Sequence, residues 1–159
     1  MTKSVIIKPV TGDEANHLLR QSDDYMASLY PAESNHLVDP SALRGKGARF
    51  IGAFLDDVCA GCVGVRFFQD SPPYGEIKRL YVDPAYRGKA IASKLMAEIE
   101  QVTIAEGIAM VRLETGVLQK AAIGLYESLG YCHIQPFGSY LDDPLSLFME
   151  KHLVPSAPA

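Results

Sequence analysis

The sequence predicts a mixed α/β (α+β) domain, in which a group of strands precedes alternating helices and strands. Three runs rich in β-branched, aromatic and small apolar residues follow one another with only turn residues between them: 48–55, 58–68 and 76–82. Residues 90–106 give the clearest helical pattern, because their apolar side chains recur every three or four positions. Strand-like runs and a helical pattern in neighbouring segments favour a mixed domain.

The chain is expected to open with a strand and a helix. Residues 5–9 predict a short first strand that Pro9 ends. Thr11 and Glu14 have the spacing of a capping box, so we expect a helix to begin there and to extend to about residue 29. The polar residues 22–24 are a candidate break in this helix.

The later elements follow from turn residues and short apolar runs. Asp56 and Asp57 are expected to turn the chain between the first two long strands, which then form a hairpin. Gly107 is expected to end the long helix. Beyond it the pattern predicts a strand, a helix and two strands, at 110–115, 121–129, 131–136 and 145–150.

The composition is that of an ordinary globular chain. With 159 residues, 48% of them apolar and 21% charged, one domain is expected over residues 3–153, followed by a frayed tail at 154–159. The formal net charge of −4 argues against a nucleic-acid partner, because a phosphate backbone requires a basic face. No apolar run approaches the ~20 residues that span a bilayer, and the apolar part of the N-terminus is too short for a signal peptide. We therefore expect a cytoplasmic protein with no membrane partner.

The cysteines predict neither a disulfide framework nor a metal site. Their number, three, is odd. Cys59 and Cys62 form a C-x-x-C within a predicted strand, where an odd offset places two side chains on opposite faces of the sheet. The four histidines are scattered along the chain, so no metal is expected.

Residues 82–92 carry the strongest chemical signal. A strand ends at Val82, a short basic loop of small residues follows, and the long helix begins directly after it. The first turn of a helix has unpaired N–H groups and a partial positive charge, and small residues let a ligand approach that backbone. Arg87 and Lys89 add positive charge, so the loop is suited to phosphate oxygens. It contains neither a Walker motif nor a dinucleotide-binding G-x-G-x-x-G.

Three blocks in this region resemble the GNAT superfamily of N-acetyltransferases. Residues 87–92 are similar to the R-G-x-G-[ILV]-[GA] acetyl-coenzyme A loop of that family, and residues 80–84 to its L-x-V-x-P strand end. Residues 122–131 are similar to its A-x-x-L-Y-x-x-x-G-[FY] helix. Within the superfamily, residues 113–116, 137–140 and 144–146 resemble a bacterial subgroup of small acetyltransferases.

The resemblance implies a fold and a cosubstrate. The fold is a mostly antiparallel twisted sheet with a parallel, splayed central pair of strands, flanked by helices. The pantetheine arm of acetyl-CoA lies between the splayed strands and pairs with the backbone of the first. The cofactor-binding residues implied for this chain are Leu80, Tyr81, Val82, Arg87, Gly88, Lys89, Ala90, Ile91, Ala92, Gln119 and Tyr126.

Two positions depart from the family pattern. Ala90 stands where the loop usually has glycine. If that position needs a positive φ, alanine costs about 1 kcal/mol, and if its φ is ordinary, nothing is lost. Gln119 replaces an asparagine often found seven residues before the tyrosine, and its longer amide can still reach the cofactor.

The resemblance also implies catalytic roles. An amine attacks the thioester directly, and Tyr126 is the candidate general acid, because a phenol stays protonated at neutral pH and can donate to the departing thiolate. Glu76 is a candidate base, since some family members carry a catalytic glutamate at this place. Glu114, on the facing strand, is the rival for proton relay or amine binding. Loops 30–36 and 137–143 should flank the acceptor site.

Three functions are compatible with the sequence. The first is transfer of an acetyl group from acetyl-CoA to a primary amine of a small molecule or peptide. The second is a non-catalytic acyl-CoA sensor on the same scaffold, and the third is a partner-binding module whose phosphate loop is incidental. The resemblance also leaves room for a homodimer formed through the C-terminal strands.

Overall fold

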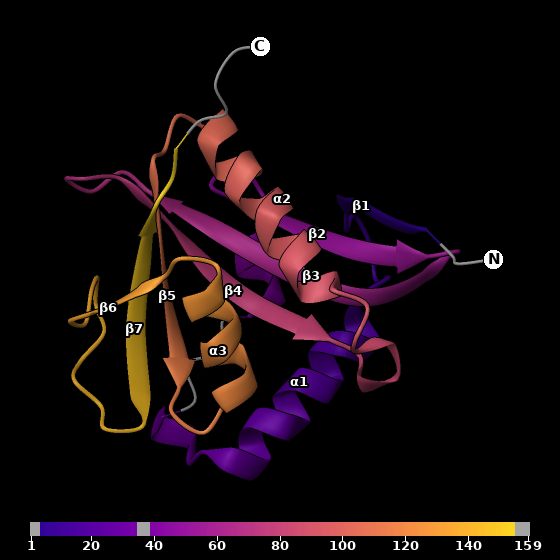
Figure 1. The fold of residues 1–159 in the computed structure, drawn as a ribbon, viewed down its shortest axis with the longest axis horizontal. Coiled ribbons are helices and arrows are strands. Elements are labelled where there is room, and N and C mark those ends of the chain that lie inside the picture. The colour runs from indigo at the N-terminus through magenta and orange to yellow at the C-terminus, as the bar shows by residue number, and fades with distance from the viewer. Residues whose placement is uncertain (1–3, 35–38, 155–159) are drawn as a thin grey trace.

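The computed structural model describes residues 4–34 and 39–154, and these form one seven-stranded sheet with helices on both faces (Figure 1). The strands lie in the spatial order β1-β2-β3-β4-β5-β7-β6. All neighbouring pairs are antiparallel except β4 and β5, which are parallel. The strand bounds are β1 Val5–Pro9, β2 Ala48–Leu55, β3 Val58–Phe68, β4 Tyr74–Val82, β5 Met110–Gly116, β6 Cys132–Ile134 and β7 Ser146–His152.

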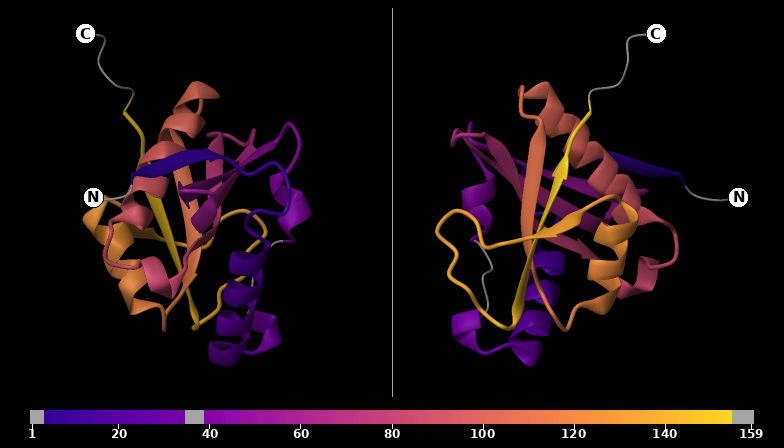
Figure 2. Two further views of the ribbon diagram at one scale, coloured as in Figure 1. Left: turned by 90° about the vertical axis from the view of Figure 1, so that its right-hand side faces the viewer. Right: turned by 60° about the vertical axis from the view of Figure 1, so that its left-hand side comes forward.

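Helix α1 (Asn16–Leu29) covers one face of the sheet, and helices α2 (Ile91–Ala105) and α3 (Lys120–Ser128) cover the other (Figure 2). The apolar stripe predicted for α2 is its buried face: Leu95, Met96 and Ile99 are fully buried against the sheet. Helix α1 buries Leu18 and Leu19 in a separate apolar cluster. Short 3₁₀ helices at Ala32–Ser34, Pro40–Leu43 and Pro84–Tyr86 complete the described elements.

The parallel pair at the centre of the sheet is short. Strands β4 and β5 pair only at Gly75 with Val111 and at Glu76 with Arg112. Beyond these residues β4 continues to Val82 and β5 to Gly116, and the two arrows diverge in Figure 1. The edge of β4 that faces β5 therefore has no strand partner beyond Glu76 within the described residues.

A β-bulge bends β4 within this open stretch. Gly64 of β3 lies opposite Lys78, whereas Cys62 lies opposite Tyr81, so β4 contains one extra residue. Arg79 absorbs the irregularity with a φ of 60°, a left-handed conformation that is uncommon for a residue other than glycine. As a result, the side chains of Lys78 and Arg79 lie on the same face of the sheet, although the two residues are consecutive.

The first helix differs from its prediction. It begins at Asn16 rather than near Thr11, although Glu14 accepts the Thr11 N–H at 3.2 Å as a capping box requires. The guanidinium of Arg44 binds the carbonyls of Thr11 and Gly12 at 3.1 and 2.6 Å, which holds them outside a helix. The expected break at 22–24 is wrong, because α1 runs without interruption to Leu29.

The other elements lie within two residues of their expected bounds, and the hairpin of β2 and β3 is confirmed. The expectation that Cys59 and Cys62 lie on opposite faces of the sheet is wrong. A register shift beside Ala53 places Cys59 opposite Phe54 and Cys62 opposite Gly52, and both thiols are buried in the cluster beneath α1. Burial raises the pKa of Cys59 to about 11 and that of Cys62 to about 12. In the described part of the chain, no three His, Cys, Asp or Glu residues gather as a metal-binding group.

The described helices include none that is long and apolar enough to cross a membrane. Of the tail expected at 154–159, residues 155–159 lie outside the described residues.

The loop before α2 is strained at Ala90, whose φ is 58° and ψ 25°. Replacing Ala90 with glycine should stabilise the ligand-free protein by about 1 kcal/mol, because glycine adopts this conformation without steric cost. A chain of this size should then melt roughly 2–4 °C higher. The matched control is Ala92→Gly, in the first turn of α2, which should lower the melting temperature because glycine is unfavourable inside a helix. A fall in melting temperature for Ala90→Gly would contradict the assigned strain.

Candidate active site

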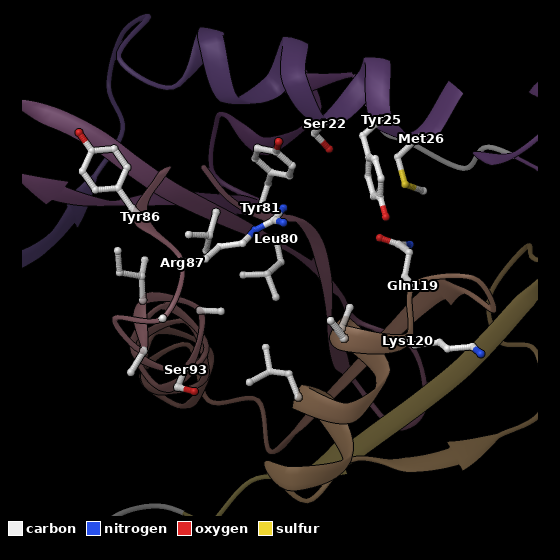
Figure 3. Close-up of a pocket in the computed structure, with 18 of the residues that line it drawn as sticks. Ser22, Tyr25, Met26, Leu80, Tyr81, Tyr86, Arg87, Ser93, Gln119 and Lys120 are labelled. Carbon is white, nitrogen blue, oxygen red and sulfur yellow. The ribbon is translucent and has the colours of Figure 1, made fainter. Parts of the chain in front are cut away.

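A cavity of about 660 Å³ lies where β4, the N-terminus of α2 and α3 meet beneath α1 (Figure 3). Nine of the eleven predicted cofactor-binding residues line it: Leu80, Tyr81, Val82, Arg87, Gly88, Ala90, Ile91, Ala92 and Gln119. Lys89 and Tyr126 are not part of this lining. Residues more than 30 positions apart in the sequence are thus brought to one concave surface, which is the usual form of a ligand site.

The loop at one end of this cavity has the geometry of an anion site. Gly88 has a φ of 84°, and a Cβ built there would meet nothing within 4 Å, so the backbone lies open to the cavity. Helix α2 follows at once, and the N–H groups of its first turn have no acceptor within the helix. No side chain of the residues that the structure describes caps this N-terminus. The partial positive charge of the helix end is therefore available to a bound anion.

The charged side chains of this lining are both cationic. Figure 3 shows Arg87 reaching across the cavity toward Tyr81, while Lys120 extends from the start of α3. The lining contains no Asp or Glu among the described residues. An anionic ligand is favoured, because it gains from both cations and meets no like charge.

Sequence reasoning missed the contribution of α1. Ser22, Tyr25 and Met26 line the cavity from α1, and Figure 3 shows the Tyr25 hydroxyl pointing toward the Gln119 side chain. Their spacing of three and four residues places them on one helix face. The signal in the sequence is this spacing, which the polar residues 22–24 obscure because they suggest a break in the helix.

A second, smaller cavity of about 80 Å³ occupies the gap between the diverging strands. Lys78 and Arg79 line it from β4, Glu114 lines it from β5, and Tyr126 lines it from α3. It shares five residues with the first cavity, so the two are adjacent: Ser22, Met26, Leu80, Gln119 and Ala122. Tyr30 and Ser34 of the predicted acceptor loop also line it, whereas residues 35 and 36 of that loop lie outside the described residues.

Tyr126 is buried and lines this second cavity. Only 7% of the residue is exposed. Burial, with a smaller contribution from the negative charge of Glu114, raises the pKa of Tyr126 above its ordinary value. The phenol therefore stays protonated at neutral pH and can act as a proton donor.

Tyr30 fixes the position of α3, which carries Tyr126. The Leu118 N–H donates to the Tyr30 hydroxyl at 2.9 Å, in the turn between β5 and α3. The Tyr30 ring lies directly against Gly116, where any Cβ would collide with it. Gly116 is therefore required for close approach of α1 to this turn.

The two candidate bases have different surroundings. Glu114 is half-buried in the lining of the second cavity and accepts a hydrogen bond from the Ser146 hydroxyl at 2.8 Å. Glu76 is 4% exposed, accepts from the Tyr140 hydroxyl at 2.6 Å and pairs with Lys78 at 3.3 Å. Glu76 belongs to neither of the two linings. Lys78 also donates to Tyr140, so these three residues form one network.

The sequence and fold have known relatives. Residues 15–131 match the Acetyltransferase (GNAT) family. The IAA acetyltransferase of Azospirillum brasilense is 43% identical over 141 residues, which are 89% of this chain and 92% of that protein. A Klebsiella pneumoniae structure described as an acyl-CoA N-acyltransferase superposes with a TM-score of 0.76 at 29% identity, covering 96% of this chain and 98% of the other.

The PaiA N-acetyltransferase of Thermoplasma acidophilum, solved in complex with coenzyme A, has the same fold. Its TM-score is 0.72 at 22% identity, with 94% of this chain and 99% of the other covered. The mixed sheet with one parallel pair is thus that of acyltransferases, as the sequence motifs implied. The chain belongs to the GNAT family of acetyltransferases.

Proposed function

We propose that the protein transfers an acetyl group from acetyl-CoA to a primary amine by direct attack of the amine on the thioester. The observation that carries this proposal is the adjacency of the two cavities. The larger one has a cationic end that suits an anion, and the smaller one has a protonated phenol and a carboxylate. The sulfur of a coenzyme bound in the first cavity would lie near their common wall, at Leu80 and Gln119.

Coenzyme A has chemical features that match each part of the larger cavity. Its pyrophosphate suits the N–H groups between Gly88 and Ala92 and the charge of Arg87. Its pantetheine arm carries amides, which suit the open edge of β4 at Leu80, Tyr81 and Val82. The same N–H groups would polarise the thioester carbonyl. We therefore assign these residues to cofactor binding.

In the reaction, a bond forms between the amine nitrogen and the acetyl carbon, and the bond from that carbon to sulfur breaks. After the attack the nitrogen is cationic and releases its second proton to solvent. Tyr126 gives its hydroxyl proton to the departing thiolate and regains one from solvent. The amine must first lose a proton, because an alkyl amine is mostly ammonium at neutral pH. We assign this proton to Glu114 rather than Glu76, because Glu114 shares a cavity with Tyr126 whereas Glu76 is bound by Tyr140 and Lys78.

Gly88→Ala should weaken the binding of acetyl-CoA about 10-fold or more, because a Cβ would stand where the phosphate approaches the backbone. Gly107→Ala is a matched control: Gly107 has a φ of 80°, is equally open, and ends α2 far from the cavity. Both variants should lose about 1 kcal/mol of stability from the same backbone strain. Calorimetric titration with acetyl-CoA should then separate them, and equal affinities would remove the loop from the cofactor site.

Tyr126→Phe should lower kcat about 10- to 100-fold with little change in acetyl-CoA affinity, because the lost hydroxyl acts in the transition state. We expect the low end of general-acid effects, since a thiolate is already a fair leaving group. Tyr131→Phe is the control, because Tyr131 is a buried neighbour of Tyr126 whose hydroxyl donates to Glu100 at 2.9 Å. That variant should lose stability and keep its turnover. Normal turnover in Tyr126→Phe, with chemistry rate-limiting, would exclude the acid role.

Glu114→Gln should lower kcat/KM most near neutral pH, and the deficit should shrink as the pH rises and free amine accumulates. Glu76→Gln should instead lower the melting temperature, because it leaves the buried Lys78 ammonium without its carboxylate. Its pH profile should keep the wild-type shape. Measured pH–rate profiles of both variants decide which glutamate is the base. A pH-dependent deficit in Glu76→Gln alone would show that the base is Glu76 and not Glu114.

A further inference from the structure

Two consecutive cationic residues of β4 are among those that line the second cavity. Lys78 and Arg79 are 8% and 7% exposed, and both line the gap between β4 and β5. In a regular strand, consecutive side chains point to opposite faces. Only the bulge in β4 brings this pair to one side.

The backbone conformation that produces this arrangement is costly. Arg79 has a φ of 60° in the middle of a strand, where glycine would be free of strain. Residues kept in such conformations cluster at ligand sites, where their side chains are needed in a particular direction. The strained backbone conformation thus sets the direction in which the Arg79 side chain points.

The guanidinium of Arg79 is incompletely satisfied. Its side chain is 1% exposed, and its Nη1 donates to Asp23 of α1 at 2.7 Å. Its Nε is buried and has no hydrogen-bond partner among the described residues. Buried N–H donors without a partner are rare in folded proteins, and a hydrogen-bond acceptor on a bound ligand is one way to satisfy them. Asp23 itself is half exposed, so it can move away from the guanidinium.

We propose that Arg79 binds a carboxylate of the acceptor, so that the substrate of this enzyme is an amino acid or a similar compound with an amine and a carboxylate. This inference rests on the proposed acetyl transfer and narrows its acceptor. Arg79 is suited to the role because a guanidinium pairs with a carboxylate through two hydrogen bonds.

The charges of the cavity complement such a zwitterion. Glu114 on β5 faces the gap from the opposite strand, where it suits the ammonium group. An acceptor with a carboxylate alone would be repelled by Glu114, and one with an amine alone would leave the buried Nε of Arg79 without an acceptor. The cavity is small, so it accommodates the reacting end of the acceptor rather than a bulky group.

The first test compares matched acceptors on the wild-type protein. Each of a panel of L-amino acids is paired with the amine formed by its decarboxylation, and thiol release from acetyl-CoA is followed. We expect the preferred amino acid to exceed its decarboxylated partner at least 10-fold in kcat/KM, as for a lost charged hydrogen-bond partner. Equal or faster acetylation of the decarboxylated amines would overturn the inference while leaving the acetyl transfer intact.

The second test replaces Arg79 itself. Arg79→Met should raise KM for the amino acid about 10- to 100-fold and should abolish the preference for the amino acid over its matched amine. Arg79→Lys should restore part of the loss. Arg20→Met, an exposed change on α1 outside both linings, is the control and should change nothing.

Asp23→Asn separates ligand binding from a structural role of the Arg79–Asp23 pair. If Arg79 binds the acceptor, removing its competing carboxylate should lower KM for the amino acid severalfold. If Arg79 only holds α1 to the sheet, Asp23→Asn should reproduce the losses of Arg79→Met, and the inference falls.

Binding without turnover distinguishes this inference from the proposed function. The amino acids and their matched amines are titrated calorimetrically into the protein saturated with coenzyme A. Amino-acid binding that depends on Arg79, without any acetylation, would support the carboxylate site and contradict the acetyl transfer. No binding of any amino acid, together with no preference in turnover, would overturn the carboxylate site.

Discussion

The separation of β4 from β5 after only two residue pairs is the constraint on which the rest of the site depends. A continued ladder would satisfy the backbone groups of β4 within the sheet and would close both cavities. Because the strands part, one edge of β4 remains open and side chains from α1 and α3 line the resulting gap. The sheet stays stable since β4 keeps its antiparallel partner β3 and β5 keeps β7 along their lengths.

Unfavourable local features gather around this gap and are absent from most of the core. Arg79 and Ala90 account for two of the three non-glycine residues with positive φ among those described. The network of Glu76, Lys78 and Tyr140 places two charges in the interior, where they must be paired to be tolerated. The apolar clusters beneath α2 and α1 supply the stability that offsets these costs.

The sequence predicted those parts that depend on local pattern. The hairpin of β2 and β3 and the helix α2 followed from periodicity, and the cofactor loop followed from small residues at a helix start. It could not predict the bulges, because a register shift depends on both strands of a pair. For that reason the two faces of the C-x-x-C were misjudged, and Lys78 and Arg79 were not recognised as neighbours in one cavity.

The central claim is that the open edge of β4 and the start of α2 hold coenzyme A. Amide hydrogen exchange with and without coenzyme A tests it most directly, because it reports the backbone groups themselves. The account predicts slower exchange at residues 80–82 and 88–92 in the complex, with unchanged exchange in β2 and at Gly107. Tight binding of coenzyme A without protection of those two segments would contradict it.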